Sequence, residues 1–504
     1  MQNEGPMTTP AFGKWRSFFW PIHRTELKKF LPMFFIFFLI AFNYNILRSY
    51  KDSIVVTASQ SGAEAIPFMK IWGVLPSAIL FTLLFTRISN WFSREKVFYI
   101  TLSIFLVFFL LFAFVLYPAQ EALHPNHFAD SLQEILPTGF KGFIAIFRNW
   151  TYTLFYVMSE LWSTAIFTVL FWGFANEVTS VEEARRYYGL LTFGGSLAGV
   201  FSGYCAIYFS SQVYFSWLPY GKTSWDQSIF FLCCTICITG LITMALFRWL
   251  NIRVISPAEK NEAPKEKIRM SMRANFKVLL QSKYLIGIAL IVFAYNVAIN
   301  LLEVVWKDQI RVLYPNPGDY NTYMGKVIFS MAIFASLTGL LTTTRVVQRY
   351  SWTASALIPP FVMGITGFLF FNFILFPNDG VSWFFSFLKM TPLMLTVTLG
   401  SVQNCLSRAS KYTFFDATKE MAFIPLSPEM KLKGKAAIDG VGSRVGKSGG
   451  SAIHQALIIA FSSVAASVPC IAVIFIIVIV GWGLTVVSLG KKFDALLEKE
   501  SLVQ

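Results

Sequence analysis

The sequence predicts an all-α membrane protein with about twelve transmembrane helices in two six-helix halves. Composition is the first reason, because the 504 residues are 55% hydrophobic and 17% aromatic, and only 14% are charged. A soluble domain carries about 25% charged residues. The second reason is that apolar stretches of about 20 residues, the length needed to cross a bilayer, recur along the chain. A charged segment, residues 251–283, divides these stretches into two sets.

The apolar stretches follow one another closely in each set. In chain order they lie at about 30–57, 65–88, 97–117, 150–176, 187–209, 229–250, 284–306, 325–344, 352–376, 390–411, 436–462 and 468–490. With the charged segment, they predict five regions. These are a cytoplasmic N-terminal segment (1–29), an N-terminal six-helix half (30–250), a cytoplasmic linker (251–283), a C-terminal six-helix half (284–490) and a cytoplasmic tail (491–504).

Basic residues predict the orientation of the chain in the membrane. The sequence has 42 Lys and Arg against 27 Asp and Glu, a net charge of +15, and the excess concentrates in alternate loops. Cytoplasmic loops carry such an excess, so we expect both termini in the cytoplasm. The polar and basic segment 1–28 resembles neither a cleavable signal peptide nor a transit peptide. We therefore expect a multi-pass protein of a bacterial inner membrane, in preference to a plastid envelope.

Three pairs of short motifs indicate that the two halves are a diverged repeat. YKDSI (50–54) resembles WKDQI (306–310), and each ends the first span of its half. FWGFANE (171–177) resembles FFDATKE (414–420), and each precedes a helix that contains GGS (194–196 and 449–451). Two six-helix halves repeated in parallel orientation are the plan of the major facilitator fold. We therefore expect a major-facilitator-like bundle.

Polar residues inside the apolar stretches fall on single helix faces. In the first stretch, Arg48 and Lys51 follow Tyr44 at i+4 and i+7, next to Asp52. Four later stretches carry similar stripes: Tyr152, Tyr156, Glu160 and Ser163 in the fourth; Asn296, Asn300, Glu303 and Lys307 in the seventh; Asn404, Ser407, Arg408 and Lys411 in the tenth; and Asp439, Arg444, Lys447 and His454 in the eleventh. Charge at membrane depth is costly and usually faces a bundle interior or a water-filled cavity.

Each stripe alone is equally well explained by an interhelical salt bridge. Together they favour a polar, cation-rich cavity between the halves, because buried ion pairs add little net stability. Arg and Lys suit phosphate oxygens, and aromatic rings suit stacking on a flat base. We expect phosphate binding by Arg48, Lys51, Lys307, Arg444 and Lys447, gating or coupling by Glu160, Glu303 and Asp439, and base or ribose contacts from Tyr152, Tyr156, Asn296, Asn300 and Asn404.

Two motifs that could be taken for other sites are discounted. GVGSRVGKSGG (440–450) resembles a nucleotide-binding Walker loop, but Val441 stands where the first glycine is required and no strand precedes it. Its glycines are better explained by close helix packing and by access of a substrate to the backbone. His124 and His127 have metal-like spacing in a loop without carboxylate support. We expect no metal site, no cofactor and no catalytic residues.

Several long motifs carry a resemblance to a known family. They are WPIHRTELKKFLPM (20–33), NYNILRSYKDSIVV (43–56), SELWS (159–163) with FWGFANE (171–177), NLLEVVWK (300–307) and, most specifically, KYTFFDATKEMAFIPLSPEMKLKGKAAIDGVGSRVGKSGGS (411–451). With these motifs, over nearly its whole length, the chain resembles the ATP/ADP translocases of chlamydiae, rickettsiae and plastids. The resemblance implies an inner-membrane carrier, not an enzyme, that exchanges external host ATP for internal ADP. The host setting implies a bacterium that lives inside other cells.

The resemblance also implies which residues and partners matter. Family positions important for transport correspond to Lys51, Glu160, Glu303 and Lys447. The expected partners are the nucleotide, with inorganic phosphate as a further candidate, and the lipid bilayer; no nucleic acid and no obligate protein partner are implied. Two positions depart from the family pattern. Ser163 replaces the usual Gly after ELW, and Asp308 replaces the Ser of WKS, which leaves base preference and the coupling ion open.

Three alternative functions compete with nucleotide exchange. A proton-coupled importer, or an exchanger of GTP, UTP or CTP, would have the same fold, with Glu160, Glu303 or His454 as proton carrier. A membrane enzyme acting on phosphorylated lipid would call for a carboxylate cluster or a catalytic His at headgroup level, and the sequence offers neither. A channel would not predict saturable exchange. Counterexchange dependence separates an exchanger from a proton-coupled importer.

Overall fold

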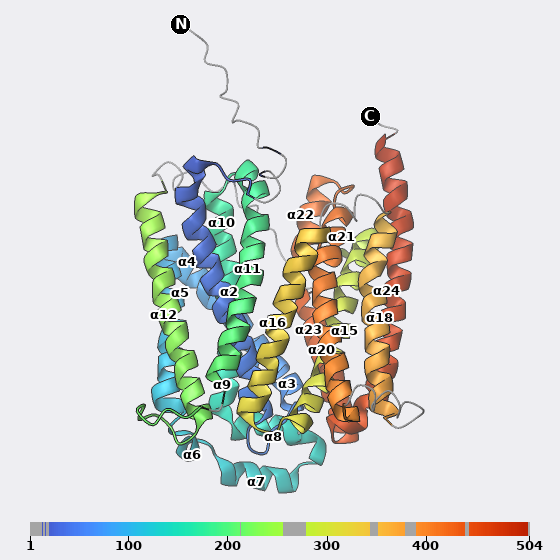
Figure 1. The fold of residues 1–504 in the computed structure, drawn as a ribbon. Coiled ribbons are helices and arrows are strands. Elements are labelled where there is room, and N and C mark those ends of the chain that lie inside the picture. Colours follow the sequence, from blue (N-terminus) through green and yellow to red (C-terminus); the bar gives the residue numbers. More distant parts are fainter. Residues whose placement is uncertain are drawn as a thin grey trace.

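A computed structural model describes residues 20–211, 213–255, 279–342, 351–377, 390–438 and 443–501, together with residues 13 and 16. Throughout this part of the chain the secondary structure is helical, with no strand. The helices form one bundle, in which α2 begins and α24 ends at the upper end (Figure 1). The short helices α6, α7 and α8 lie at the lower end.

The helices of the first half are, in order, η1 (Arg24–Glu26), α2 (Leu27–Val56), α3 (Ala65–Phe68), η2 (Met69–Val74), α4 (Leu75–Trp91), α5 (Arg94–Leu111), η3 (Phe112–Leu116), α6 (Gln120–Leu123), α7 (Asn126–Ile135), η4 (Thr138–Phe140), α8 (Lys141–Arg148), α9 (Trp150–Trp162), η5 (Ser163–Trp172), α10 (Gly173–Val178), α11 (Val181–Phe209) and α12 (Ser224–Arg253). Of these, η2, η3 and η5 are π-helical turns that continue an α-helix without a break.

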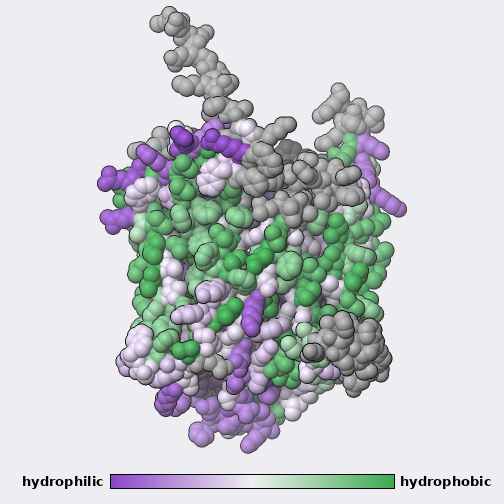
Figure 2. Space-filling model, in the orientation of Figure 1, coloured by the Kyte–Doolittle hydropathy of each residue, from purple (hydrophilic) through white to green (hydrophobic). Residues whose placement is uncertain are grey.

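The helices of the second half are α15 (Lys283–Leu313), α16 (Pro317–Thr342), α18 (Trp352–Leu375), α20 (Pro392–Ser410), η6 (Lys411–Phe415), α21 (Asp416–Ala422), α22 (Pro428–Ala437), α23 (Ser443–Phe461) and α24 (Val464–Ser501). Within the described residues, nine helices of the two halves are long and apolar enough to cross a membrane. α16, α20 and α23 run alongside them in the bundle (Figure 1). The outer surface agrees, because a broad apolar band lies between hydrophilic ends (Figure 2).

The segment between the third and fourth apolar stretches is largely helical, which corrects the expectation of a loop at His127, whereas His124 lies in the turn between α6 and α7. Residues 120–148 form α6, α7, η4 and α8, and His127 lies within α7. The His124 ring nitrogen Nε2 lies 2.7 Å from Thr151 Oγ1, and burial lowers the pKa of this imidazole. The amphipathic sequence of these helices suits a layer at the membrane boundary, with one face on the bundle.

Two hydrophobic cores stabilise the bundle, and the chain divides between them. One core is built from residues 22–255, and the other mainly from residues 279–493. The lower end of α2 crosses this division, because Val55 and Val56 pack into the second core. The two halves are therefore joined at the lower end of α2.

Glycines allow the closest helix approach between the halves. Gly199 and Gly203 of α11 face α16, where a Cβ atom on Gly203 would lie 2.7 Å from the backbone nitrogen of Phe329. On the other side, Gly325 of α16 lies against the backbone of α11. Two glycines spaced by four residues on a helix permit this kind of backbone contact. Such a crossing is sensitive to any added side chain.

Glycines of the Walker-like segment also serve close helix packing, as its sequence indicated. A Cβ atom on Gly446 would lie 2.9 Å from the Cβ of Asn296, and one on Gly450 would lie 2.9 Å from the Cβ of Asn300. These glycines let α23 approach α15 at the level of its polar stripe. From Ser443 onward the segment is therefore a helix that packs against α15, and not a phosphate-binding loop.

A charged site between the two halves

A buried ion pair links the two halves at the lower end of the site. Lys307 of α15 lies 2.8 Å from the Asp52 carboxylate of α2. Lys51 bonds the other oxygen of the same carboxylate at 3.0 Å. Asp52 is 0% exposed and Lys307 is 2% exposed, so this contact excludes water. One carboxylate thus holds an ammonium group from each half.

Glu303 collects three cations from three helices. It lies 3.2 Å from Lys307, one helical turn away on α15, 3.7 Å from Arg48 of α2, and 3.6 Å from Arg408 of α20. Arg48 belongs to the first half, so this cluster also crosses between the halves. The polar stripes predicted on the first, seventh and tenth apolar stretches therefore meet at one carboxylate.

The fourth stripe joins the site through Glu160, but only in part. Glu160 of α9 lies 3.0 Å from Lys51, and the Lys51 ammonium also lies 4.2 Å from the centre of the Tyr156 ring. Tyr156 is fully buried. Tyr152 does not reach the site, because its ring packs against Tyr117 and His124, with ring centres 6.1 and 5.1 Å away.

Of the three Asn residues predicted to contact the base or ribose, one lies in the site and two bond to their own helices. Asn300 lies in the site, where its Nδ2 donates to the Lys447 carbonyl at 2.9 Å. The Nδ2 groups of Asn296 and Asn404 donate instead to carbonyls one turn back in their own helices, those of Val292 (2.8 Å) and Gly400 (3.1 Å). Both side chains are buried, so in this state they stabilise helix packing.

Lys70 belongs to the site although the sequence reasoning missed it. Its ammonium donates to Asn300 Oδ1 at 3.4 Å, from the π-helical turn η2 (Met69–Val74). Single π-helical turns inside α-helices occur frequently at functional sites. Lys70 is a cation inside the apolar stretch at 65–88, so the criterion that selected Lys51 would have found it.

The upper part of the site is accessible. Lys447 of α23 is exposed, and it is close enough to Glu160, Arg408 and Lys411 to interact with their charges. Tyr412, beside Lys411, is 52% exposed. Arg444 lies on α23 about one turn before Lys447, and the structure does not describe its side chain. Asp439 lies outside the described residues.

Positive charge dominates the site. Among the described residues, seven cations come together with four acids. The cations are Arg48, Lys51, Lys70, Lys307, Arg408, Lys411 and Lys447, and the acids are Asp52, Glu160, Glu303 and Asp416. Such a surplus, accessible from one end, suits a ligand with several negative charges.

A second polar contact closes the lower end beside the ion pairs. Asn321 of α16 accepts hydrogen bonds from Ser49 (2.5 Å) and Ser53 (2.9 Å) of α2. Its Nδ2 donates to Ser210, which directly follows α11, at 2.8 Å. Asn321 is completely buried. Its polar atoms are thus satisfied by the opposite half, so opening the lower end must break these bonds.

The helical layer at the lower end also contacts both halves. Gly139 of η4 lies so close to the end of α23 that a Cβ atom there would stand 2.5 Å from the carbonyl oxygen of Ile459. The contacts between the halves described above all lie at mid-height or below. The structure is therefore closed at the lower end and accessible at the upper end.

Comparison with known sequences gives a family for this arrangement. The family described as TLC ATP/ADP transporter matches residues 6–493. The chain is 46% identical over 490 residues to ADP,ATP carrier protein 1 of Chlamydia trachomatis, covering 96% of this chain and 92% of that one. It is 44% identical over 499 residues to ADP,ATP carrier protein 1 of Chlamydia pneumoniae, covering 97% and 96%. A chloroplastic ADP,ATP carrier protein 1 of Arabidopsis thaliana is 40% identical over 476 residues, covering 94% and 76%.

Solved structures show the same fold at low sequence identity. A bacterial homologue of the iron transporter ferroportin, in an inward-facing state, has a TM-score of 0.54 at 13% identity and covers 91% of this chain and 98% of that one. A D-xylose–proton symporter has a TM-score of 0.53 at 13% identity, covering 90% and 97%. These likenesses confirm the predicted all-α, major-facilitator-like fold.

Proposed function

The chain belongs to the TLC ATP/ADP transporter family, and we propose that it exchanges ATP for ADP across a bacterial inner membrane through the charged site between its halves. The observation that carries this proposal is the surplus of cations at a site accessible from one end only. Nucleotide phosphates supply the negative charge that such a site lacks. The protein is a transporter and not an enzyme, as its family indicates.

The accessible cations are the first to meet the phosphates. Lys447 is exposed, and Arg48 and Arg408 reach Glu303 only at 3.7 and 3.6 Å, longer than a direct hydrogen bond. Arginine can bind a phosphate through two parallel hydrogen bonds. We assign phosphate binding first to these three residues and to Lys70. Lys51 and Lys307 are already held by Asp52, and in this state the Lys307–Asp52 pair keeps the lower end closed.

The Asp52–Lys307 pair is the principal gate in this assignment. The two groups come from opposite halves, are buried, and lie 2.8 Å apart. Alternating access requires one half to rock against the other, and rocking that opens the lower end must separate them. The Lys51–Asp52 pair lies within α2 and persists in both states. The lower end therefore opens only when Lys307 gains another partner.

Substrate binding supplies the change of partners. Phosphate oxygens compete with Glu160 and Glu303 for the same cations, and the displaced carboxylates are then free to attract others. We expect the upper end to be cytoplasmic, from the basic loops on that side. The structure then corresponds to the state that receives internal ADP. The opposite state, open below, receives external ATP.

Uptake into proteoliposomes tests the function directly. Vesicles preloaded with ADP, ATP, GTP or nothing are supplied with labelled ATP outside. Exchange predicts rapid uptake into vesicles that contain ADP or ATP, and almost none into empty vesicles. An uncoupler should leave this uptake unchanged. Uptake into empty vesicles that an uncoupler abolishes would contradict exchange and identify a proton-coupled importer.

A further inference from the structure

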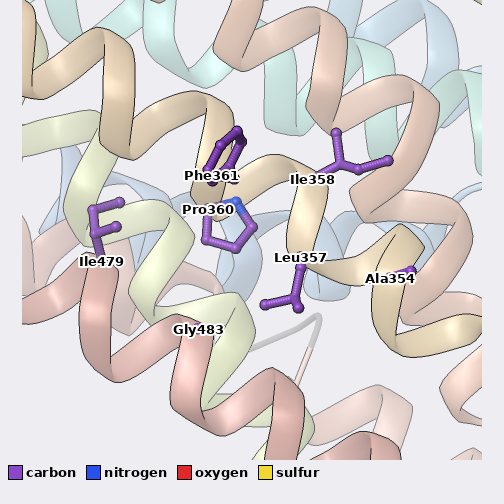
Figure 3. A pocket seen from close by; sticks show the side chains of 7 residues that line it. All are labelled: Ala354, Leu357, Ile358, Pro360, Phe361, Ile479 and Gly483. Atoms are coloured by element: carbon purple, nitrogen blue, oxygen red, sulfur yellow. The ribbon is translucent and has the colours of Figure 1, made fainter.

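Two grooves on the membrane-facing surface differ in their lining. The groove between α18 and α24 has a volume of about 420 Å³ and apolar walls, among them Leu357, Phe361 and Ile479 (Figure 3). It offers a place for hydrocarbon and no polar partner. The groove between α16 and α20 has a volume of about 260 Å³ and is lined by Tyr323, Lys326, Ser330, Thr398, Ser401 and Cys405.

Lys326 makes the second groove unusual. It is exposed, yet it lies nine residues beyond Pro317, where α16 begins. At 1.5 Å per residue, this places it about 13 Å along the helix. The residues two to three turns further up the same face are apolar and exposed, namely Ile333, Phe334 and Leu337. This face of α16 is therefore turned to the hydrocarbon of the bilayer.

The cation of Lys326 has no acidic partner in the part of the chain that the structure describes. A lysine is positively charged at neutral pH, and an unpaired charge is unfavourable in hydrocarbon. Its four-carbon side chain allows the ammonium to extend toward the nearer membrane surface. In that direction the groups that a bilayer provides are lipid phosphates. Figure 2 shows a hydrophilic patch at mid-height over α16, within the otherwise apolar surface.

Hydroxyl groups complete a polar end of the groove. Tyr323 OH and Ser401 Oγ are 2.6 Å apart. Ser401 Oγ also donates to the Val397 carbonyl and accepts from Trp306 Nε1, so it is the Tyr323 oxygen that can still accept a hydrogen bond. Ser330 and Thr398 line the same groove. Above them, Phe334 and Val402 continue it as an apolar surface. The groove thus combines a cation and hydroxyls with apolar side chains above them, a set of groups that suits a phospholipid.

We propose that the groove between α16 and α20 binds an anionic phospholipid of the leaflet at the lower end, with its phosphate on the Lys326 ammonium. One acyl chain lies along Phe334 and Val402. Net negative charge distinguishes this lipid from a zwitterionic one, because a zwitterionic headgroup brings its own cation to the phosphate. Since α16 forms the close crossing with α11, the lipid binds beside a helix that moves in transport.

Lipid binding to the purified full-length protein tests the site. Native mass spectrometry measures the apparent affinity for phosphatidylglycerol and for phosphatidylcholine. Lys326→Gln should weaken phosphatidylglycerol binding about five- to tenfold and leave phosphatidylcholine unchanged, while Lys326→Arg should keep the wild-type preference. Lys222→Gln removes the same charge from an exposed loop and serves as the matched control.

Three results would overturn the proposal. The first is equal phosphatidylglycerol affinity in the wild type and Lys326→Gln, with both proteins melting at the same temperature. The second is an equal loss in Lys222→Gln, which would indicate only a general attraction of basic residues to anionic lipid. The third is a wild-type dimer that becomes monomeric in Lys326→Gln, because a second copy of the chain would then cover the groove.

Discussion

Replacing Asp52 with Asn should release the lower gate. Among the described contacts, Asp52 is the only group of α2 that forms an ion pair with Lys307 of the other half. The two groups lie 2.8 Å apart, and both are buried from solvent. Removing one partner of a buried ion pair costs about 3–5 kcal/mol. Because Lys307 still has Glu303 as a partner at 3.2 Å, we take the lower end of this range, about 3 kcal/mol. In the open state both groups are hydrated, so the cost applies to the closed state alone.

The expected shift between the two states is large enough to measure. A change of about 3 kcal/mol alters the equilibrium about 150-fold in favour of the state open below. A cysteine at Val56 reports this state, because Val56 is fully buried in the core of the opposite half. The six native cysteines are replaced first. A membrane-impermeant maleimide then measures the labelling rate from the side of the lower end.

Two controls keep this experiment specific. Asp416→Asn removes an acid whose partner, Lys411, lies in the same half, so it should leave the labelling rate nearly unchanged. A cysteine at Val486, which is buried within the second half, should stay unlabelled in every variant. An unchanged rate at Val56 in a normally folded Asp52→Asn protein would refute the gate. So would an equal increase in the Asp416→Asn protein.

Three further predictions concern other contacts. Lys447→Ala should weaken nucleotide binding about 10- to 150-fold, because a hydrogen bond to a charged group contributes about 1.5–3 kcal/mol; calorimetric binding showing unchanged affinity would contradict the assignment. Glu303→Gln should allow efflux of preloaded ATP without external ADP, and efflux that still requires ADP would exclude a gating role. Gly203→Ala should destabilise the protein by about 1–3 kcal/mol in a melting assay, because its Cβ would lie 2.7 Å from the Phe329 nitrogen. Gly189→Ala, on the same helix with nothing within 4 Å, is its control, and equal effects would exclude the close crossing.

The sequence predicted the membrane-spanning helices because the length of an apolar stretch can be read from neighbouring residues alone. The first apolar stretch, expected at about 30–57, corresponds to α2 (Leu27–Val56). The layer formed by α6, α7 and α8 was missed for a related reason, since its helices are short and amphipathic and give no long apolar signal. The number of spans, predicted as about twelve, remains a prediction beyond the nine of the described residues.

The sequence also predicted which charged residues lie at the site, but not their pairing. Helical spacing placed Lys51 and Glu303 on polar faces, and both lie in the site. Pairing depends on how the two halves are tilted and rotated against each other, and no local pattern records this. Asp52 was noted only as the neighbour of Lys51, although its carboxylate forms the buried ion pair between the halves. Tyr152 shares a helix face with Tyr156, yet one turn along α9 takes it out of the site.

The order of charges from the accessible side to the gate offers a physical reason for obligatory exchange. Arg408 lies 3.6 Å from Glu303, Glu303 lies 3.2 Å from Lys307, and Lys307 lies 2.8 Å from Asp52. We infer that a phosphate which draws Arg408 away leaves Glu303 with fewer cations, so that Glu303 attracts Lys307 more strongly. Lys307 then interacts less with Asp52, and the contact that holds the lower end closed weakens. Without a substrate each carboxylate in the series keeps its partners, and the empty carrier stays closed below.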